Sequence, residues 1–338
     1  VRLPDLEAAA RLEDLYRQAN DWAGVSRALA TQARYGSDRD ERVACWLKAA
    51  RIEREQRHDR EAASRLYEEV LAVDPENLTA LWFQCLWTYE TGRGAEALPL
   101  FARAEARLEE EIATDPEDGT IAAASLLYRY GELLRADGRE EEALERYLRA
   151  LSFIPEHQPS LEAAGPLLVE RQEWPRARQV WRALLRITGA LGEPQKRAQV
   201  HTMLGLVDQA EGHRDLAFKR FTRALEAYPN HVPALRGLAS ELEHRGDWNT
   251  LLSVYNAVIY HATAPQDVID AYMIKGRILD ERLDRPDKAV QHYERSLAFE
   301  GKQPWACLRL AELALRRGAW DDALGYAGRG VDVATEEP

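Results

Sequence analysis

Histidines are the first side chains to consider for chemistry in this 338-residue chain, because paired histidines are common metal ligands. His157 and His231 stand in matching contexts, Pro-Glu-His-Gln-Pro and Pro-Asn-His-Val-Pro. The functional interpretation is a pair of metal ligands. However, 74 residues separate them and their contexts are equivalent, which favours the same structural role in two turns. We therefore expect no metal site.

The other motifs of catalysis are missing. Cys45, Cys85 and Cys307 lie far apart, without metal-ligand spacing, and each falls in an apolar helical pattern that predicts a buried, reduced thiol. The sequence has no glycine-rich phosphate loop, no His-Glu-x-x-His and no nucleophile elbow. We predict that the chain is not an enzyme and needs no cofactor.

Composition and charge narrow the class of partner. With 46% hydrophobic and 30% charged residues, the sequence is typical of a soluble globular protein. Its net charge of -12 argues against nucleic acid and anionic membranes as partners. No apolar run approaches the roughly 18 residues of a membrane span. We expect a cytoplasmic location, leaving open a removed signal sequence, and the preference for arginine over lysine favours a bacterial source.

The elements that position these residues are predicted to be helices in a repeating pattern. Four segments place an alanine four residues before an aromatic ring, so that both lie on one helix face. Glycines in the preceding segment form notches that permit close helix contact, and a proline ends three of the four segments. The alanine–aromatic pairs are Ala63 and Tyr67, Ala143 and Tyr147, Ala217 and Phe221, and Ala289 and Tyr293.

This pattern resembles the tetratricopeptide repeat, a 34-residue helix-turn-helix. Six positions match in one repeat: Gly131, Gly138, Ala143, Tyr147, Ala150 and Pro155. Another six match in a second: Gly205, Gly212, Ala217, Phe221, Ala224 and Pro229. The resemblance implies an all-α fold, an α-α superhelix that forms one right-handed solenoid. We expect about nine helix pairs, at 5–36, 40–75, 77–115, 117–155, 158–192, 195–229, 232–264, 267–301 and 304–333.

Two departures and a longer period are expected within this array. The second helix of the third repeat should continue through Glu109–Glu111, and the join near Gly189–Pro194 should be long. Alternate repeats place a tryptophan just after the turn, which predicts a duplicated unit of two repeats. These tryptophans, which we expect to pack rather than bind, are Trp22, Trp174, Trp248 and Trp320.

In the resembled family, the first helix of each repeat lines a concave groove. In the third repeat this implies Thr79 and a stripe of Trp82, Leu86 and Tyr89, with Leu81, Cys85 and Thr88 facing inward. The stripe is either an interaction patch or covered by the long third repeat. The other expected partner-binding positions are Tyr128, Glu132, Arg135, Thr202, Gln209, Arg236, Glu243, Arg277 and Glu312.

These features predict a protein-interaction scaffold that binds a partner protein or peptide, within a larger assembly or a longer chain. The alternative is a sensor or regulatory array that controls an attached enzyme such as a kinase or protease. The Lys/Asn clamp with which some members of the family hold acidic chaperone tails is absent. The partner, the oligomeric state and the use of the concave or the convex face stay open.

The C-terminal segment is expected to be incomplete as a cap. Its apolar residues include Leu324 and Val331, and three glycines, Gly325, Gly328 and Gly330, make it a weak helix. A solenoid needs a polar final face. We therefore expect that the chain continues past Pro338 or that this end docks onto another domain or subunit, with simple fraying as the alternative.

Overall fold

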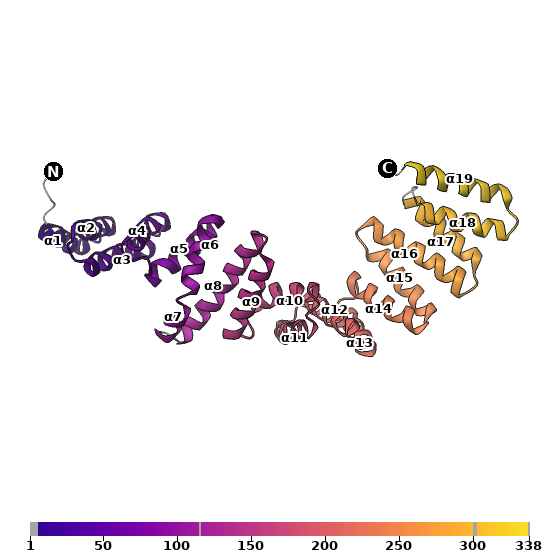
Figure 1. Ribbon diagram of the computed structural model, residues 1–338, viewed down its shortest axis with the longest axis horizontal. Coiled ribbons are helices and arrows are strands. Elements are labelled where there is room, and N and C mark those ends of the chain that lie inside the picture. The colour runs from indigo at the N-terminus through magenta and orange to yellow at the C-terminus, as the bar shows by residue number, and fades with distance from the viewer. Residues whose placement is uncertain (1–5, 115, 300–302, 337–338) are drawn as a thin grey trace. The chain divides into compact units, whose positions relative to one another are not determined.

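The computed structural model describes residues 6–114, 116–299 and 303–336, and nearly all of them lie in helices (Figure 1). No β-strand occurs within these ranges, which confirms the all-α prediction. The first half contains α1 (Leu6–Gln18), α2 (Trp22–Tyr35), α3 (Arg39–Glu55), α4 (Arg60–Val73), α5 (Leu78–Glu90), α6 (Gly94–Glu105), α7 (Leu108–Thr114), α8 (Pro116–Ala136), α9 (Glu140–Phe153) and α10 (Gln158–Glu170). The second contains α11 (Trp174–Leu191), α12 (Pro194–Ala210), α13 (Arg214–Ala227), α14 (Val232–Arg245), α15 (Trp248–His261), α16 (Pro265–Arg277), η1 (Ile278–Arg282), α17 (Pro286–Phe299), α18 (Pro304–Arg316) and α19 (Trp320–Glu336).

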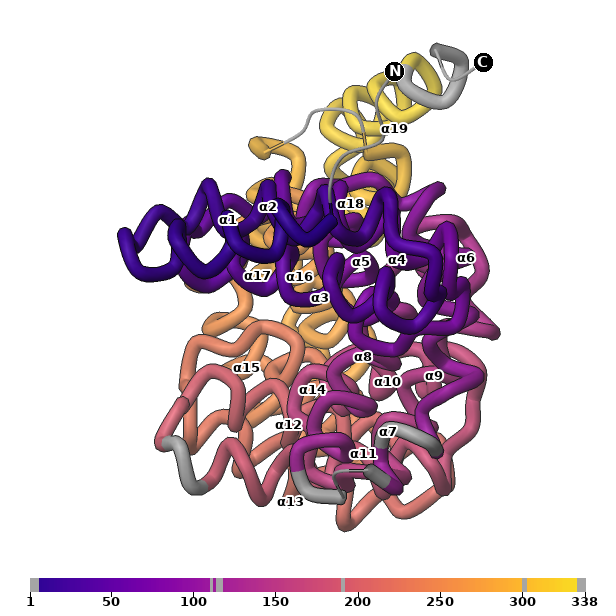
Figure 2. Tube along the Cα trace, turned by 90° about the vertical axis from the view of Figure 1, so that its left-hand side faces the viewer, coloured from indigo at the N-terminus to yellow at the C-terminus, as the bar shows by residue number. Residues whose placement is uncertain are grey.

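The chain divides into two compact units, Val1–Leu167 and Leu168–Pro338, and the division falls inside α10. Within each unit, consecutive helices pair side by side. Examples are α8 with α9 in the first unit and α18 with α19 in the second (Figures 1 and 2). Each pair has one face that only a neighbouring pair can bury, which is how helical repeat arrays build a continuous core.

Local sequence sets the ends of the helices. Asp21, Asp38, Asp59 and Asn77 each accept a hydrogen bond from a backbone N–H in the first turn of the helix that follows. Such caps satisfy N–H groups that lack a partner within the helix. In the turn between α8 and α9, Gly138 has φ 80°, a conformation that residues with a Cβ rarely adopt.

The alanine–aromatic pattern forms the core of the repeats. Ala143, Tyr147, Ala217 and Phe221 are all fully buried. A Cβ built on Gly131 would lie 2.4 Å from the Tyr147 ring, so only glycine lets the ring lie against α8. The notches predicted from the sequence are therefore sites where an aromatic ring contacts the backbone of the preceding helix.

The prediction for the third repeat was wrong. Its second helix, α6, ends at Glu105, and α7 is a separate helix that starts at Leu108. The buried side chain of Leu108, 1% exposed, occupies the core after the two-residue break. At the other departure, the additional residues extend α11 to Leu191, and Gly192 ends it in the left-handed conformation with φ 70°.

Tryptophans begin α2, α11, α15 and α19, as the longer period predicted. Trp22, Trp174 and Trp248 are partly buried, consistent with a packing role. Trp320 departs from this pattern because it is 65% exposed, with no further repeat against it in the described part of the chain. Cys85 and Cys307 are fully buried and Cys45 is partly buried, and all three are free thiols.

Candidate functional site

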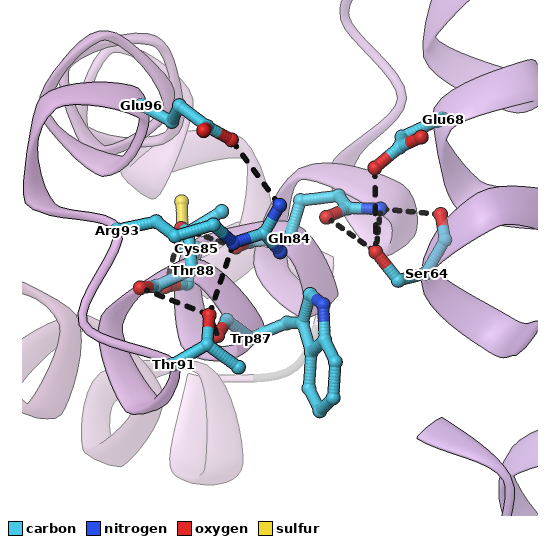
Figure 3. A network of polar contacts seen from close by, with 9 residues as sticks. All are labelled: Ser64, Glu68, Gln84, Cys85, Trp87, Thr88, Thr91, Arg93 and Glu96. Atoms are coloured by element: carbon cyan, nitrogen blue, oxygen red, sulfur yellow. Dashed lines mark hydrogen bonds and ion pairs between the residues drawn. The ribbon is translucent and has the colours of Figure 1, made fainter. Parts of the chain in front are cut away.

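The orientation of α5 is fixed by polar contacts on its inner side. The amide of Gln84 is buried and donates to the Ser64 carbonyl oxygen at 2.5 Å and to Ser64 Oγ at 3.1 Å, which joins α5 to α4 (Figure 3). The Thr88 hydroxyl donates back to the Gln84 carbonyl oxygen at 2.6 Å. Leu81 and Cys85 are buried on the same side, as predicted.

The opposite side of α5 borders a cavity of about 430 Å³. Thr79, Trp82 and Leu86 line it from α5, so the structure brings together two residues of the predicted stripe and the groove position before them. The indole Nε1 of Trp82 is buried and has no hydrogen-bond partner among the described residues. A buried donor without an acceptor is costly, and a ligand that supplies the acceptor would be bound specifically.

Arginines and a further aromatic ring complete this cavity: Arg54, Arg60 and Phe83. The Arg60 guanidinium lies 6.0 Å from the Phe83 ring centre and pairs with Glu90 at 2.5 Å. Arg54 pairs with Glu55 at 2.7 Å, and this hydrogen bond is the main cause of the lowered pKa of the Glu55 carboxyl. The cavity therefore combines an apolar wall, an unpaired N–H donor and two cationic side chains.

Tyr89 does not line the cavity. Its ring is half-buried and lies 6.4 Å from Phe101 of α6, in an edge-to-face arrangement. The predicted stripe is therefore divided: Trp82 and Leu86 face the cavity, whereas Tyr89 contacts the second helix of its own repeat.

The predicted positions of the fourth repeat serve internal contacts. Tyr128 is half-buried between Tyr147, at 6.1 Å between ring centres, and His157, at 5.9 Å. Glu132 accepts a hydrogen bond of 2.5 Å from the Tyr147 hydroxyl, while Arg135 is exposed. The pKa of the Tyr147 hydroxyl is raised, chiefly by burial and then by the Glu132 carboxylate.

His157 has the structural role predicted for it. Its Nδ1 lies 2.8 Å from Ser160 Oγ, and its ring contacts Tyr128. Burial lowers the pKa of His157 and also that of His231, which precedes α14. Both rings are therefore held in their neutral form by the helices around them.

Thr202 is a correction to the predicted site. It is only 2% exposed, and its hydroxyl donates to the Ala198 carbonyl oxygen at 2.8 Å. A hydroxyl one helical turn from a backbone carbonyl satisfies itself in this way. Thr202 is therefore on the buried side of α12 and is not available to a partner.

The remaining predicted positions of the second unit pair between successive repeats. The Gln209 amide donates to Ser240 Oγ at 2.9 Å, and Arg236 forms an ion pair with Asp267. Glu243 and Arg277, which were both predicted, pair at 3.4 Å. Within α18, Glu312 pairs with Arg309 at 2.9 Å. These side chains form cross-repeat contacts, and exposed pairs of this kind contribute little to stability.

Sequence reasoning missed a second cavity, of about 420 Å³, in the second unit. It lies beside η1, a short π-helix that continues α16. Tyr293 is 17 residues from Gly276, whereas Tyr147 and Phe221 are 16 residues from Gly131 and Gly205. The additional residue is the signal that could have indicated the π-helix. The residues that line the cavity are Met273, Ile274, Arg277, Glu281, Tyr293, Trp305 and Arg309.

One acidic cluster has the geometry of metal ligands but is occupied by an arginine. Ligand atoms of Asp208, Glu211 and His213 lie within 4.8 Å of one another. The Arg178 guanidinium donates to Asp208 at 2.7 Å and also to Glu211. A guanidinium at this place neutralises the carboxylates, so the cluster joins α11 to α12 as an ion-pair network.

Two further surfaces were considered. Within the described ranges, no helix is both long enough and apolar enough to cross a membrane. On α19, Leu324 and Val331 are 73% and 61% exposed, and the helix extends to Glu336 despite its glycines. Pro338 lies outside the described residues. Docking of this end onto another domain or subunit stays a prediction.

Comparison with known proteins indicates the fold. No protein-family model and no curated protein sequence matches the chain. A solved structure of the C-terminal part of a tetratricopeptide repeat-containing protein from Cytophaga hutchinsonii is 16% identical, with a TM-score of 0.54, over 78% of this chain and 99% of that one. A chain in the structure of Naa15/Naa10 bound to HypK-THB is 19% identical, with a TM-score of 0.50. That match covers 80% of this chain but only 39% of the other. The chain has the tetratricopeptide-repeat fold.

Proposed function

We propose that this tetratricopeptide-repeat protein is a non-enzymatic scaffold that binds a partner protein or peptide through the first helices of its repeats. The observation that carries the proposal is the cavity on α5, where the predicted positions Thr79, Trp82 and Leu86 converge. Aromatic residues in desolvated pockets are frequent anchors of protein interfaces.

The chemistry of the cavity suggests what the partner presents. The apolar side chains of Trp82, Phe83 and Leu86 favour an apolar anchor, and the unpaired Trp82 N–H favours a neighbouring carbonyl or carboxylate oxygen. Arg54 and Arg60 would add charge-assisted hydrogen bonds to such an oxygen. A peptide supplies both features, because each residue carries a backbone carbonyl beside its side chain.

Other observations agree with a scaffold. A chain of the same fold is part of the assembly of Naa15/Naa10 bound to HypK-THB. The chain's net charge of -12 favours a protein over a nucleic acid as the partner, since phosphates would be repelled. Tyr89 and Arg135 extend the proposed surface as secondary contacts, whereas Glu132 and the paired residues of the second unit support the array itself.

Quantitative affinity capture tests the proposal. The full chain and its Trp82→Ala variant are used as baits in lysate of the source cells, and bound proteins are compared by mass spectrometry. We expect at least one abundant protein to be lost with Trp82→Ala and retained with the control Tyr260→Ala, which removes an aromatic side chain that is 83% exposed. Identical sets of proteins on wild type and Trp82→Ala, with unchanged helicity, would refute the proposed site.

A further inference from the structure

The eighth repeat has the same buried tyrosine as the fourth but lacks its hydrogen-bond partner. Tyr147 is fully buried, and its hydroxyl donates to Glu132 at 2.5 Å. Tyr293 is 1% exposed, and its hydroxyl is buried with no hydrogen-bond partner among the described residues. Most buried polar atoms in proteins have a partner, so this hydroxyl requires an explanation.

The difference arises from one position on the preceding helix. Glu132 follows Gly131, against which the Tyr147 ring lies. Arg277 follows Gly276 in the same way, and a Cβ on Gly276 would lie 2.5 Å from the Tyr293 ring. An arginine therefore stands where the fourth repeat has the carboxylate. An arginine cannot accept the hydrogen bond, because it carries only donors.

The sixth repeat shows that the hydroxyl is dispensable for packing. There the ring is Phe221, which lies against Gly205 in the same arrangement, and the residue after the glycine is Leu206. In that repeat the hydroxyl and its acceptor are both absent. Only the eighth repeat, of these three, keeps the hydroxyl and removes the acceptor.

A cavity lies where the acceptor is missing. Tyr293, Arg277 and Trp305 are among the residues that line its volume of about 420 Å³. Arg277 contacts Glu243 at 3.4 Å, a long ion pair, and its side chain is 50% exposed. Trp305 is 64% exposed, so both side chains can change rotamer and admit a ligand to the hydroxyl.

The second arginine of the cavity is differently placed. Arg309 is held between Glu281 and Glu312, each at 2.9 Å, and its guanidinium lies 5.9 Å from the Trp305 ring centre. Its charge is already neutralised by these carboxylates. Arg277 is therefore the cation of the cavity with the weaker internal partner.

We propose that this cavity binds a side-chain carboxylate, from a glutamate or aspartate of a partner peptide, which takes the place that Glu132 occupies in the fourth repeat. The carboxylate accepts the hydrogen bond of the Tyr293 hydroxyl and pairs with Arg277. Apolar side chains next to the acidic residue contact Met273, Ile274 and Trp305. The inference rests on the proposed function in one respect, that the partner is a protein or peptide.

Two matched peptides test the site with the full chain. The probe is fluorescein-labelled Gly-Leu-Glu-Leu-Gly with an amidated C-terminus, and its control has glutamine in place of glutamate. Fluorescence polarisation should give a dissociation constant about tenfold lower for the glutamate peptide, since a charge-assisted hydrogen bond distinguishes the two. Equal affinities, or no binding of the glutamate peptide at millimolar chain concentration, would overturn the proposal.

Three variants assign the effect to this cavity. Tyr293→Phe, which Phe221 shows to be compatible with the fold, should abolish most of the preference for glutamate. Arg277→Glu should abolish binding because it supplies an internal carboxylate. The control Arg65→Gln removes an exposed arginine paired with Glu61 and should change nothing. Unchanged preference in Tyr293→Phe and Arg277→Glu would contradict the assignment.

A third peptide and the capture experiment separate the alternatives. A glutamine peptide with a free C-terminal carboxylate that binds as tightly as the glutamate peptide would contradict a side-chain site. If capture depends on Trp82 but the glutamate preference is absent, this inference fails and the proposed function stands. If the preference is present but capture does not depend on Trp82, the site of the proposed function fails instead.

Discussion

At the scale of single residues, the contacts of one hydroxyl decide whether a buried tyrosine stabilises its repeat. Tyr147 and Tyr293 occupy equivalent places, yet only Tyr147 has an acceptor. A hydrogen bond to a charged group contributes about 1.5–3 kcal/mol, whereas an unsatisfied buried group destabilises. The same substitution at the two positions should therefore have opposite effects.

We predict that Tyr147→Phe lowers the free energy of unfolding by about 2 kcal/mol and that Tyr293→Phe leaves it unchanged or raises it. Urea denaturation followed by circular dichroism measures both variants against the wild type. Equal losses at the two positions would mean that the Tyr293 hydroxyl has a partner in solution.

Buried histidines predict a pH dependence. Burial, followed by nearby arginines, lowers the pKa of His201 to about 4, and burial with Lys275 and Arg295 does the same for His292. The unfolded chain binds a proton near the ordinary value of about 6.5. Between about pH 6.5 and 4 the unfolded state therefore binds more protons than the folded state, and stability falls as the pH falls.

We expect each of these histidines to lower the free energy of unfolding by about 2 kcal/mol when the pH is lowered from about 7.5 to about 5. His201→Asn should show a smaller loss over this interval than the wild type, whatever its starting stability. Denaturation curves at the two pH values measure the difference. An identical pH slope in the variant would show that His201 is not held neutral.

At the scale of elements, the glycine notches explain why the fold could be predicted. The spacing of Gly131, Ala143 and Tyr147 is a local pattern with one physical solution: two helices in close contact with a ring between them. Patterns of this kind repeat along the chain, so errors do not accumulate. The all-α fold and the tryptophans at helix starts followed from them.

The failures at this scale have a shared cause. Periodicity gives the faces of a helix but not which of two adjacent faces meets a neighbour, so Thr202 was placed in the groove although it is buried. It also does not show where a helix stops when no proline or glycine marks the end, as at the break before Leu108. The cavity beside η1 depends on one additional residue, which a pattern of conserved spacing treats as noise.

Two glycine-to-alanine changes test the notch directly. Gly131→Ala should lower the thermal midpoint, because its Cβ would lie 2.4 Å from the Tyr147 ring, and overpacking costs about 1–3 kcal/mol. Gly325→Ala in α19 should raise stability by about 0.5–1 kcal/mol, because nothing lies within 4 Å of the new Cβ and alanine favours a helix. A midpoint that rises for both variants would contradict the account of the notch.

At the scale of the whole molecule, the chain consists of two units, and each has a cavity lined by the first helices of its repeats. Each cavity contains a buried donor without an acceptor, Trp82 Nε1 in the first and the Tyr293 hydroxyl in the second. A scaffold that binds peptides would use such donors, since they gain an acceptor only when the partner is bound.

Site-specific photocrosslinking tests most directly whether the α5 cavity contacts a partner. Benzoylphenylalanine replaces Leu86, which lines the cavity, or Tyr260, which is exposed elsewhere, and the full chain is irradiated in lysate of the source cells. The account predicts a discrete crosslinked protein at position 86 that is missing at position 260 and decreases when Trp82→Ala is added. No crosslink at position 86, or the same products at both positions, would contradict the central claim.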